Sequence, residues 1–191
     1  MGLEYYAETN RLEAFYDAII AIIVTILVLE LPQPETATIS AIWSLRLSYL
    51  AYLISFLVCV NMWQYYHKIF RHVEKINNRV IWLNILLMLV LSIIPYLTLF
   101  VSENFDSIVA QALYGLDFII VDVILAVTSY LLLKLNPESE YLKSALNIKN
   151  ILILPLILFI ISFIIGFMGY PQLISIICLL TVITSIIQDI K

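Results

Sequence analysis

The sequence predicts an all-α, polytopic membrane protein with six transmembrane helices per subunit. The 191-residue chain is 63% hydrophobic and only 13% charged, which exceeds the apolar content of soluble domains. Its apolar residues also gather into six segments of about 20 residues, the length that spans a bilayer as a helix. Short polar connections leave no stretch for a soluble domain. We therefore expect a single six-helix transmembrane domain over residues 1–191.

The first three segments are expected at residues 13–31, 40–66 and 80–101. Glutamates near the start of the chain do not fit the basic leader of a cleaved signal peptide, so we expect the first segment to be retained. Pro32 and Pro34 end this segment, because proline has no backbone N–H to donate into a continuing helix. Pro95 lies inside the third segment and is expected to kink it without ending it.

The last three segments are expected at residues 108–133, 148–169 and 172–188. Asn136 and Pro137 end the fourth segment. Gly166, Gly169 and Pro171 mark a tight turn between the fifth and the sixth. The boundary at Asn136 and Pro137, like the one at Pro32 and Pro34, falls where the charge pattern also requires it.

Basic residues gather on one side of the predicted membrane, and acidic residues on the other. The basic side holds Arg11, Lys68, Arg71, Lys75, Arg79, Lys134, Lys143, Lys149 and Lys191. The opposite connections hold Glu30, Glu35, Glu103 and Asp106, with Arg46 as their only basic residue. By the positive-inside rule, both termini are expected in the cytoplasm of a multi-pass protein of the cell membrane. Membrane lipid is its expected surrounding, and no nucleic-acid partner is expected.

Two cysteines, Cys59 and Cys178, both lie inside predicted spans. Their spacing supports neither a disulfide framework nor a metal site, and a free buried cysteine is ordinary. The sequence therefore predicts no cofactor and no resident metal.

Ionisable residues at membrane depth are costly unless paired or hydrated, so each is a candidate for function. Here they are Asp17, His67, Asp117 and Asp122. Asp17 fits a helix-start carboxylate stabilised by Arg11 and by the helix dipole. Asp117 and Asp122 are five residues apart, about 140° around a helix, so they cannot share one site directly. Each can bond a neighbouring helix, or the two can serve a proton relay of a transporter.

A stripe of residues along the first segment keeps one helix face turned in a single direction. Phe15, Ala18, Ile22, Thr25 and Leu29 are spaced by 3, 4, 3 and 4 residues. Such spacing is typical of a face that meets other helices. Packing within a bundle explains it, and so does the lining of a shared axis.

The residues of this stripe and their neighbours resemble the transmembrane protein 175 family, the prokaryotic relatives of the endolysosomal potassium channel. The first-segment resemblance rests on Arg11, Phe15, Asp17, Ala21, Ile22, Thr25, Val28 and Leu29. It continues in the next three segments through Ser55, Phe56, Trp63, His67, Phe70, Trp82, Leu83, Asn84, Pro95, Tyr114 and Gly115. The last two segments match only in hydrophobicity and length.

The resemblance implies a homotetrameric potassium channel in which four copies of the first helix surround the cation pathway. It implies a constriction of branched aliphatic side chains without a carbonyl filter. Carried over by position, the rings are Ile22, Ile26 and Leu29, with Thr25 as a nearby hydroxyl ring. Thr25 and Ile26 lie 100° apart around the helix, so helix rotation decides which one faces the axis. Glu30 is expected at the outer mouth, where it raises the local concentration of cations such as K⁺.

The chain departs from the family pattern at two positions, Tyr16 and Tyr66. The family carries serine between the phenylalanine and aspartate of the first helix, and paired histidines on the second. We expect the two replacements to compensate each other within one structural polar cluster. The predicted members of that cluster are Arg11, Tyr16, Asp17, His67, Trp82 and Asn84.

Two other classes of function are less well supported. A proton-coupled secondary transporter would use Asp117, Asp122 and His67, but the chain lacks the internal repeats typical of transporters. An intramembrane enzyme is not expected, because His67 has no serine or cysteine near it in sequence and no helical metal-binding pattern. Potassium flux without a proton gradient separates a channel from a coupled transporter.

Overall fold

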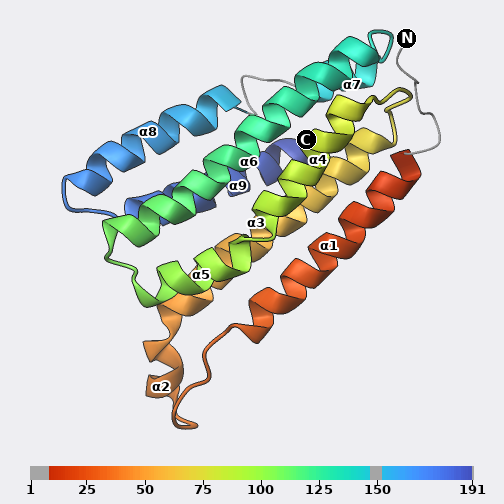
Figure 1. The fold of residues 1–191 in the computed structure, drawn as a ribbon. Coiled ribbons are helices and arrows are strands. Elements are labelled where there is room, and N and C mark those ends of the chain that lie inside the picture. The colour runs from red at the N-terminus through yellow and green to blue at the C-terminus, as the bar shows by residue number, and fades with distance from the viewer. Residues whose placement is uncertain (1–8, 147–151, 191) are drawn as a thin grey trace.

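The computed structural model describes residues 9–146 and 152–190, which fold into helices joined by short turns (Figure 1). In chain order, the helices are α1 (Thr9–Leu29), α2 (Ile39–Ser44), α3 (Arg46–Phe70), α4 (Asn78–Leu91), α5 (Ile94–Glu103), α6 (Ile108–Leu135), α7 (Glu140–Ala145), α8 (Leu154–Phe167) and α9 (Leu173–Ile190). The all-α class is thereby confirmed for the described residues.

Four segments are long and apolar enough to cross a membrane. They are Arg11–Leu29, Arg46–Phe70, Asn78–Glu103 and Ile108–Leu135. The apolar helices α8 and α9 are shorter. At 1.5 Å per residue, the 14 residues of α8 reach about 21 Å, less than the hydrocarbon thickness of about 30 Å. The structure therefore supports a multi-pass membrane protein, and the count of six spans stays a prediction.

Most helix ends follow the predicted breakers. α1 ends at Leu29, shortly before Pro32, and α6 ends at Leu135 with Asn136 as its C-cap. Gly169 has a φ of 111° in the turn between α8 and α9, a conformation that glycine adopts without steric cost. The start of the predicted fifth span at residue 148 lies outside the described residues, as do Lys149 and Lys191.

Two of the predicted spans are divided in the structure. The span expected at residues 40–66 begins later, at Arg46, and extends to Phe70, because the short α2 ends where the chain turns at Leu45. The span containing Pro95 is split into α4 and α5 by a turn at Ser92 and Ile93. Both turn residues keep right-handed helical backbone angles, so α5 continues roughly along α4 (Figure 1).

The long helices alternate in direction, which brings the basic connections to one end of the bundle (Figure 1). α1 begins, α3 ends and α6 ends at that basic end. A small apolar cluster closes it, formed by Ile69, Val73, Ile76, Val80, Leu132, Leu142 and Leu146. Glu30, Glu103 and Asp106 lie at the opposite end, near the other helix termini.

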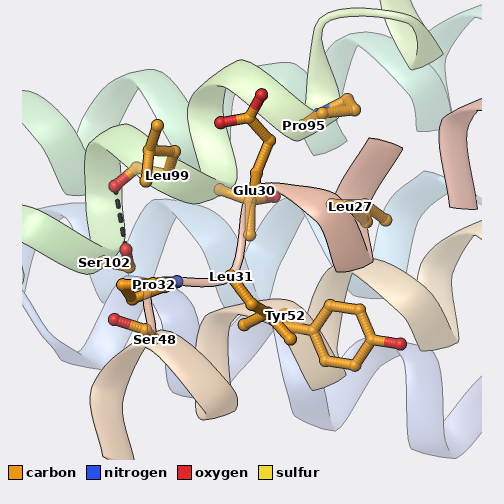
Figure 2. A pocket seen from close by; sticks show the side chains of 10 residues that line it. Leu27, Glu30, Leu31, Pro32, Ser48, Tyr52, Pro95, Leu99 and Ser102 are labelled. Atoms are coloured by element: carbon orange, nitrogen blue, oxygen red, sulfur yellow. Dashed lines mark hydrogen bonds between the residues drawn. The ribbon is translucent and has the colours of Figure 1, made fainter. Parts of the chain in front are cut away.

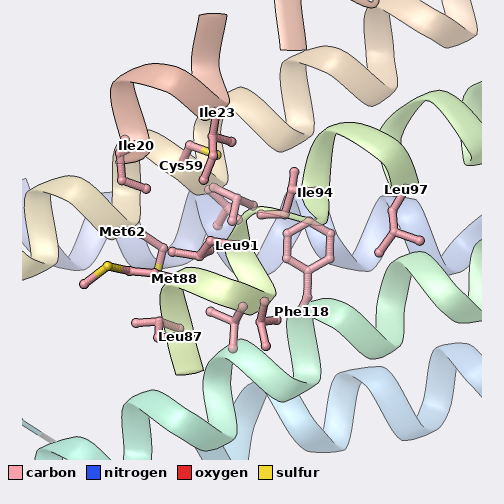
Figure 3. Close-up of a cluster of buried hydrophobic side chains, with 14 of the residues drawn as sticks. Ile20, Ile23, Cys59, Met62, Leu87, Met88, Leu91, Ile94, Leu97 and Phe118 are labelled. Carbon is pink, nitrogen blue, oxygen red and sulfur yellow. The ribbon is translucent and has the colours of Figure 1, made fainter. Parts of the chain in front are cut away.

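α3 contacts α1, α5 and α9. α1 packs mainly against α3, with further contacts to α4 and α5. Its buried residues are Leu12, Tyr16, Ile20, Ile23 and Leu27, whose spacings of 4, 4, 3 and 4 form one face. Figure 3 shows Ile20 and Ile23 near Cys59 of α3 and Ile94 of α5. The core therefore holds one face of α1 and leaves the other uncovered.

Candidate functional site

The uncovered face of α1 carries the stripe predicted from the sequence. Leu29 is 76% exposed and Ile22 58% exposed, and Phe15, Ile26 and Thr25 are exposed as well. Exposed apolar side chains in a membrane protein meet lipid or another subunit. The structure thus brings all four predicted pore residues to the same open side of one helix.

Thr25 presents its hydroxyl oxygen on this open side. Its Oγ1 donates a hydrogen bond of 2.7 Å to the carbonyl oxygen of Ala21, one turn earlier. A hydroxyl has one proton to donate and two lone pairs to accept with. Because the proton is directed back to α1, the oxygen is left as an acceptor, which is the polarity that a cation requires.

At the basic end of the bundle, two side-chain contacts hold α1 on α3. The Trp63 indole Nε1 donates to Asp17 Oδ1 over 2.9 Å. His67 Nδ1 lies 3.1 Å from Glu13 Oε1, an ion pair when the imidazole is protonated. Trp63 and His67 also stack, with ring centroids 5.5 Å apart. The spacing of four residues on both helices aligns the two contacts. Together they fix the rotation of α1 and its axial position relative to α3.

A second attachment is aromatic and lies in the core beside the first. Tyr16 of α1 stacks on Tyr66 of α3 with ring centroids 4.1 Å apart. Tyr66 in turn stacks on Phe70 at 5.2 Å. Both tyrosines are buried, and neither hydroxyl has a hydrogen-bond partner within the described residues. The contact is therefore one of ring packing.

The six residues predicted as one polar cluster have different surroundings in the described part of the chain. Asp17 and His67 are joined through Trp63, and Tyr16 lies in the aromatic stack. Asn84 is buried, but its Nδ2 donates to the Val80 carbonyl of its own helix. Trp82 is 69% exposed on the outside of α4, and Arg11 is exposed at the start of α1.

Sequence reasoning missed Glu13 and did not assign Trp63 to the polar cluster. A signal for both was present, because Glu13 and Asp17 are four residues apart on α1, and Trp63 and His67 are four apart on α3. Residues at that spacing share a helix face. Two such pairs can meet when their helices pack side by side.

The acidic end of α1 rests against α5. Glu30 follows the last residue of α1 and is exposed, near Pro95 and Leu99 of α5 (Figure 2). These side chains help to line a cavity of about 10 Å³, which is about large enough for one water molecule. The outer end of α1 thus meets both α5 and α3 around this cavity.

The acidic residues of α6 lie apart from α1. Asp117 is buried, and its Oδ2 has no hydrogen-bond partner in the part of the chain that the structure describes. Asp122 is half-buried. No three histidine, cysteine, aspartate or glutamate side chains gather as a metal site among residues 9–146 and 152–190.

The apolar helices define a multi-pass integral membrane protein, and the comparisons with known proteins place it in the class of ion channels. The family model of the endosomal/lysosomal potassium channel TMEM175 matches residues 11–95. A potassium channel from Chryseobacterium sp. (strain P1-3) is 31% identical over 140 residues, which cover 73% of each chain. The chain belongs to the TMEM175 family of potassium channels, which are not enzymes.

Other relatives agree with this assignment. A potassium channel from Streptomyces collinus is 33% identical over 117 residues, 57% of each chain. The crystal structure of a lysosomal potassium-selective channel TMEM175 homolog from Chamaesiphon minutus matches with a TM-score of 0.83 and 26% identity. That match covers 96% of this chain and 98% of the other. Membership of a channel family does not favour the alternative function, a proton-coupled transporter.

Proposed function

We propose that this protein is a potassium-selective channel in which α1 lines a central pore. The observation that carries the proposal is the division of α1 into two faces. One face is buried against α3 and α5, while Ile22 and Leu29 on the other are 58% and 76% exposed. A pore-lining helix needs both faces, since the buried face anchors the helix and the exposed face borders the ion path.

One copy of α1 cannot enclose a lumen, so the pore requires several subunits. We infer a homotetramer of six-span subunits, the arrangement that the resemblance to the family implies. Four copies of α1 then place Ile22, Ile26 and Leu29 in rings around the axis. A narrow apolar ring dewets and bars a hydrated ion, and a small widening lets the ion pass. Side-chain bulk therefore controls conduction.

Thr25 supplies the polar contact within this apolar pathway. Its proton is bonded to the Ala21 carbonyl, which leaves the hydroxyl oxygen to face K⁺. Four such oxygens replace part of the hydration shell of the ion. We infer that Thr25 contributes to selectivity, while the aliphatic rings set the width. K⁺ is the permeant ion, and no cofactor takes part.

The charge distribution supports an orientation in the cell membrane. The basic end of the bundle faces the cytoplasm by the positive-inside rule, and both termini lie on that side. Glu30 then lies at the outer mouth and concentrates cations there, an effect that added salt weakens. Lipid contacts the remaining outer surface of the assembly.

Potassium flux into liposomes tests the proposal. Leu29→Ser and Ile22→Ser are expected to raise basal K⁺ flux about tenfold and to lower the preference for K⁺ over Na⁺, because a polar ring wets at a smaller width. The matched control is Ile160→Ser on α8, which changes the same residue type at a similar exposure of 52%. Unchanged flux and selectivity in both α1 variants would show that these side chains do not form the constriction.

A further inference from the structure

Three buried hydroxyl groups from three helices form a continuous hydrogen-bonded chain. Ser55 Oγ of α3 lies 2.6 Å from Thr98 Oγ1 of α5 and 2.8 Å from the Tyr114 hydroxyl of α6. Thr98 Oγ1 also donates to the Ile94 carbonyl oxygen over 2.7 Å. Ser55, Thr98 and Tyr114 are all buried. We call these three residues the hydroxyl relay.

One ordering of the protons fills all three short contacts. Thr98 gives its proton to the Ile94 carbonyl, so Ser55 must donate to Thr98, and Tyr114 must donate to Ser55. In the reverse ordering, the 2.7 Å contact between Thr98 and the Ile94 carbonyl has no proton. The Tyr114 hydroxyl would then donate to the Ala51 carbonyl oxygen, which is 3.5 Å away. The relay therefore runs in one direction, from α6 through α3 to α5.

The relay ends in α5, close to the junction between α4 and α5. Pro95 occupies the first turn of α5 and has no N–H, and the turn at Ser92 and Ile93 separates α5 from α4. A helix broken in this way can pivot at the break. Thr98 lies one turn beyond Pro95, so its bond to Ser55 fixes the direction that α5 takes.

α5 also forms, together with Ser48 and Tyr52 of α3, the surface against which the outer end of α1 packs. Leu27 and Glu30 line the same small cavity as Pro95, Thr98 and Leu99 (Figure 2). Leu27 is buried there, whereas Leu29, two residues later, is exposed on the opposite face of α1. A displacement of α5 that moves Leu27 therefore also moves Leu29.

We propose that the hydroxyl relay positions α5 as the support of α1 and thereby sets the resting width of the pore at Leu29. Ser55, Thr98 and Tyr114 are positioning residues, because they act on the pore only through α5 and α1. This inference rests on the proposed constriction. Loss of the relay lets α5 pivot, and the Leu29 ring then widens and wets more often.

Paired substitutions at Thr98 test the relay. Thr98→Val keeps the shape and removes the hydroxyl, and it is expected to raise basal K⁺ flux about three- to tenfold in liposomes. Thr98→Ser retains the hydroxyl and is expected to keep the wild-type flux. Ser129→Ala is the control: it removes a short 2.7 Å hydroxyl contact between α3 and α6, with Tyr65, away from α5. It is expected to leave the flux unchanged.

Tyr114→Phe is a second variant, and it provides the test if Thr98→Val does not assemble. It removes the first donor of the relay and is also expected to raise the flux. Wild-type flux in the variants that lack a relay hydroxyl overturns the inference. An equal rise in Ser129→Ala also overturns it, because general loosening of the bundle then explains the effect.

Leu29→Ser, measured alongside, separates this inference from the proposed function. If Leu29→Ser raises the flux and the relay variants do not, the relay has no role and the constriction stands. If Leu29→Ser leaves the flux unchanged, the constriction at Leu29 is wrong, and the inference fails with it.

Discussion

Tyr16 and Tyr66 stack face to face, with ring centroids 4.1 Å apart and ring planes inclined by 19°. These are the two positions at which the chain departs from the family pattern of serine and histidine. The structure places the two departures in direct contact in the interface between α1 and α3. The phenol ring of Tyr16 therefore finds its room and its partner in the second replacement.

Restoring both family residues together is expected to cost less stability than the sum of the two single restorations. Tyr16→Ser leaves a cavity beside Tyr66 and is expected to lower the free energy of unfolding by about 2–4 kcal/mol. Tyr66→His removes the same stack. Because each substitution removes the same Tyr16–Tyr66 contact, the cost of the double variant is expected to be about 1 kcal/mol less than the sum of the two single costs. Thermal unfolding of the detergent-solubilised channel measures this coupling, and strict additivity would contradict it.

The helices could be predicted from the sequence because apolar length and proline position decide them. α6 was expected at residues 108–133 and is found at Ile108–Leu135. The break at Leu45 could not be predicted, since the residues before it are as apolar as those after it. In the structure, the Thr38 side chain accepts a hydrogen bond from Ala41 N and starts a separate short helix, which ends at Leu45.

The candidate site could be predicted only in part. The stripe on α1 follows from helical periodicity, which holds wherever the helix lies. Contacts between helices depend on their relative height and rotation, which periodicity does not contain. The spacing of four residues places Glu13 with Asp17 and Trp63 with His67 on shared helix faces, but which of these side chains meet could not be predicted. Trp82 was placed in the cluster by resemblance alone and is exposed in the single chain.

The acidic residues of α6 provide a test of the channel against the transporter. Asp117→Asn and Asp122→Asn keep the side-chain shape and remove the ability to carry a proton. If the protein is a channel lined by α1, both variants are expected to keep the wild-type K⁺ flux, because Asp117 is buried away from the open face of α1. Liposome flux with and without a proton gradient measures this. A loss of flux in either variant, or a fixed ratio of protons to K⁺, would support the transporter.

Gly115 allows α6 and α9 to approach closely. A Cβ atom at this position would lie 2.5 Å from Cγ2 of Ile174, a buried side chain. Gly115→Ala is therefore expected to lower the free energy of unfolding by about 1–3 kcal/mol. Ile174→Leu moves the branch away from Cβ and is expected to recover part of that loss. Gly166→Ala is the milder comparison, since its nearest neighbour is the flexible end of Ile108 at 3.2 Å. Equal melting temperatures for the two alanine variants would contradict this reading.

Asn136 joins the end of α6 to the connection between α3 and α4. Its Oδ1 accepts hydrogen bonds from the backbone N–H groups of Glu74 at 3.1 Å and Lys75 at 2.8 Å. Its Nδ2 donates to the carbonyl oxygens of Lys75 and Leu132, both at 3.0 Å. The buried amide thus accepts two hydrogen bonds and donates two. It attaches the loop containing Lys75 to the end of α6.

Loss of this amide is expected to loosen the basic end of the bundle. Asn136→Ala leaves backbone groups without partners and is expected to lower the free energy of unfolding by about 2–3 kcal/mol. Asn136→Asp keeps both acceptor contacts but cannot donate as a carboxylate, so its cost should be intermediate. Asn104→Ala, which removes one exposed bond to the Phe100 carbonyl, should cost less than about 0.5 kcal/mol. Thermal unfolding ranks the three variants. If Asn136→Ala lowers the stability no more than Asn104→Ala, water replaces the hydrogen bonds of the Asn136 amide without loss.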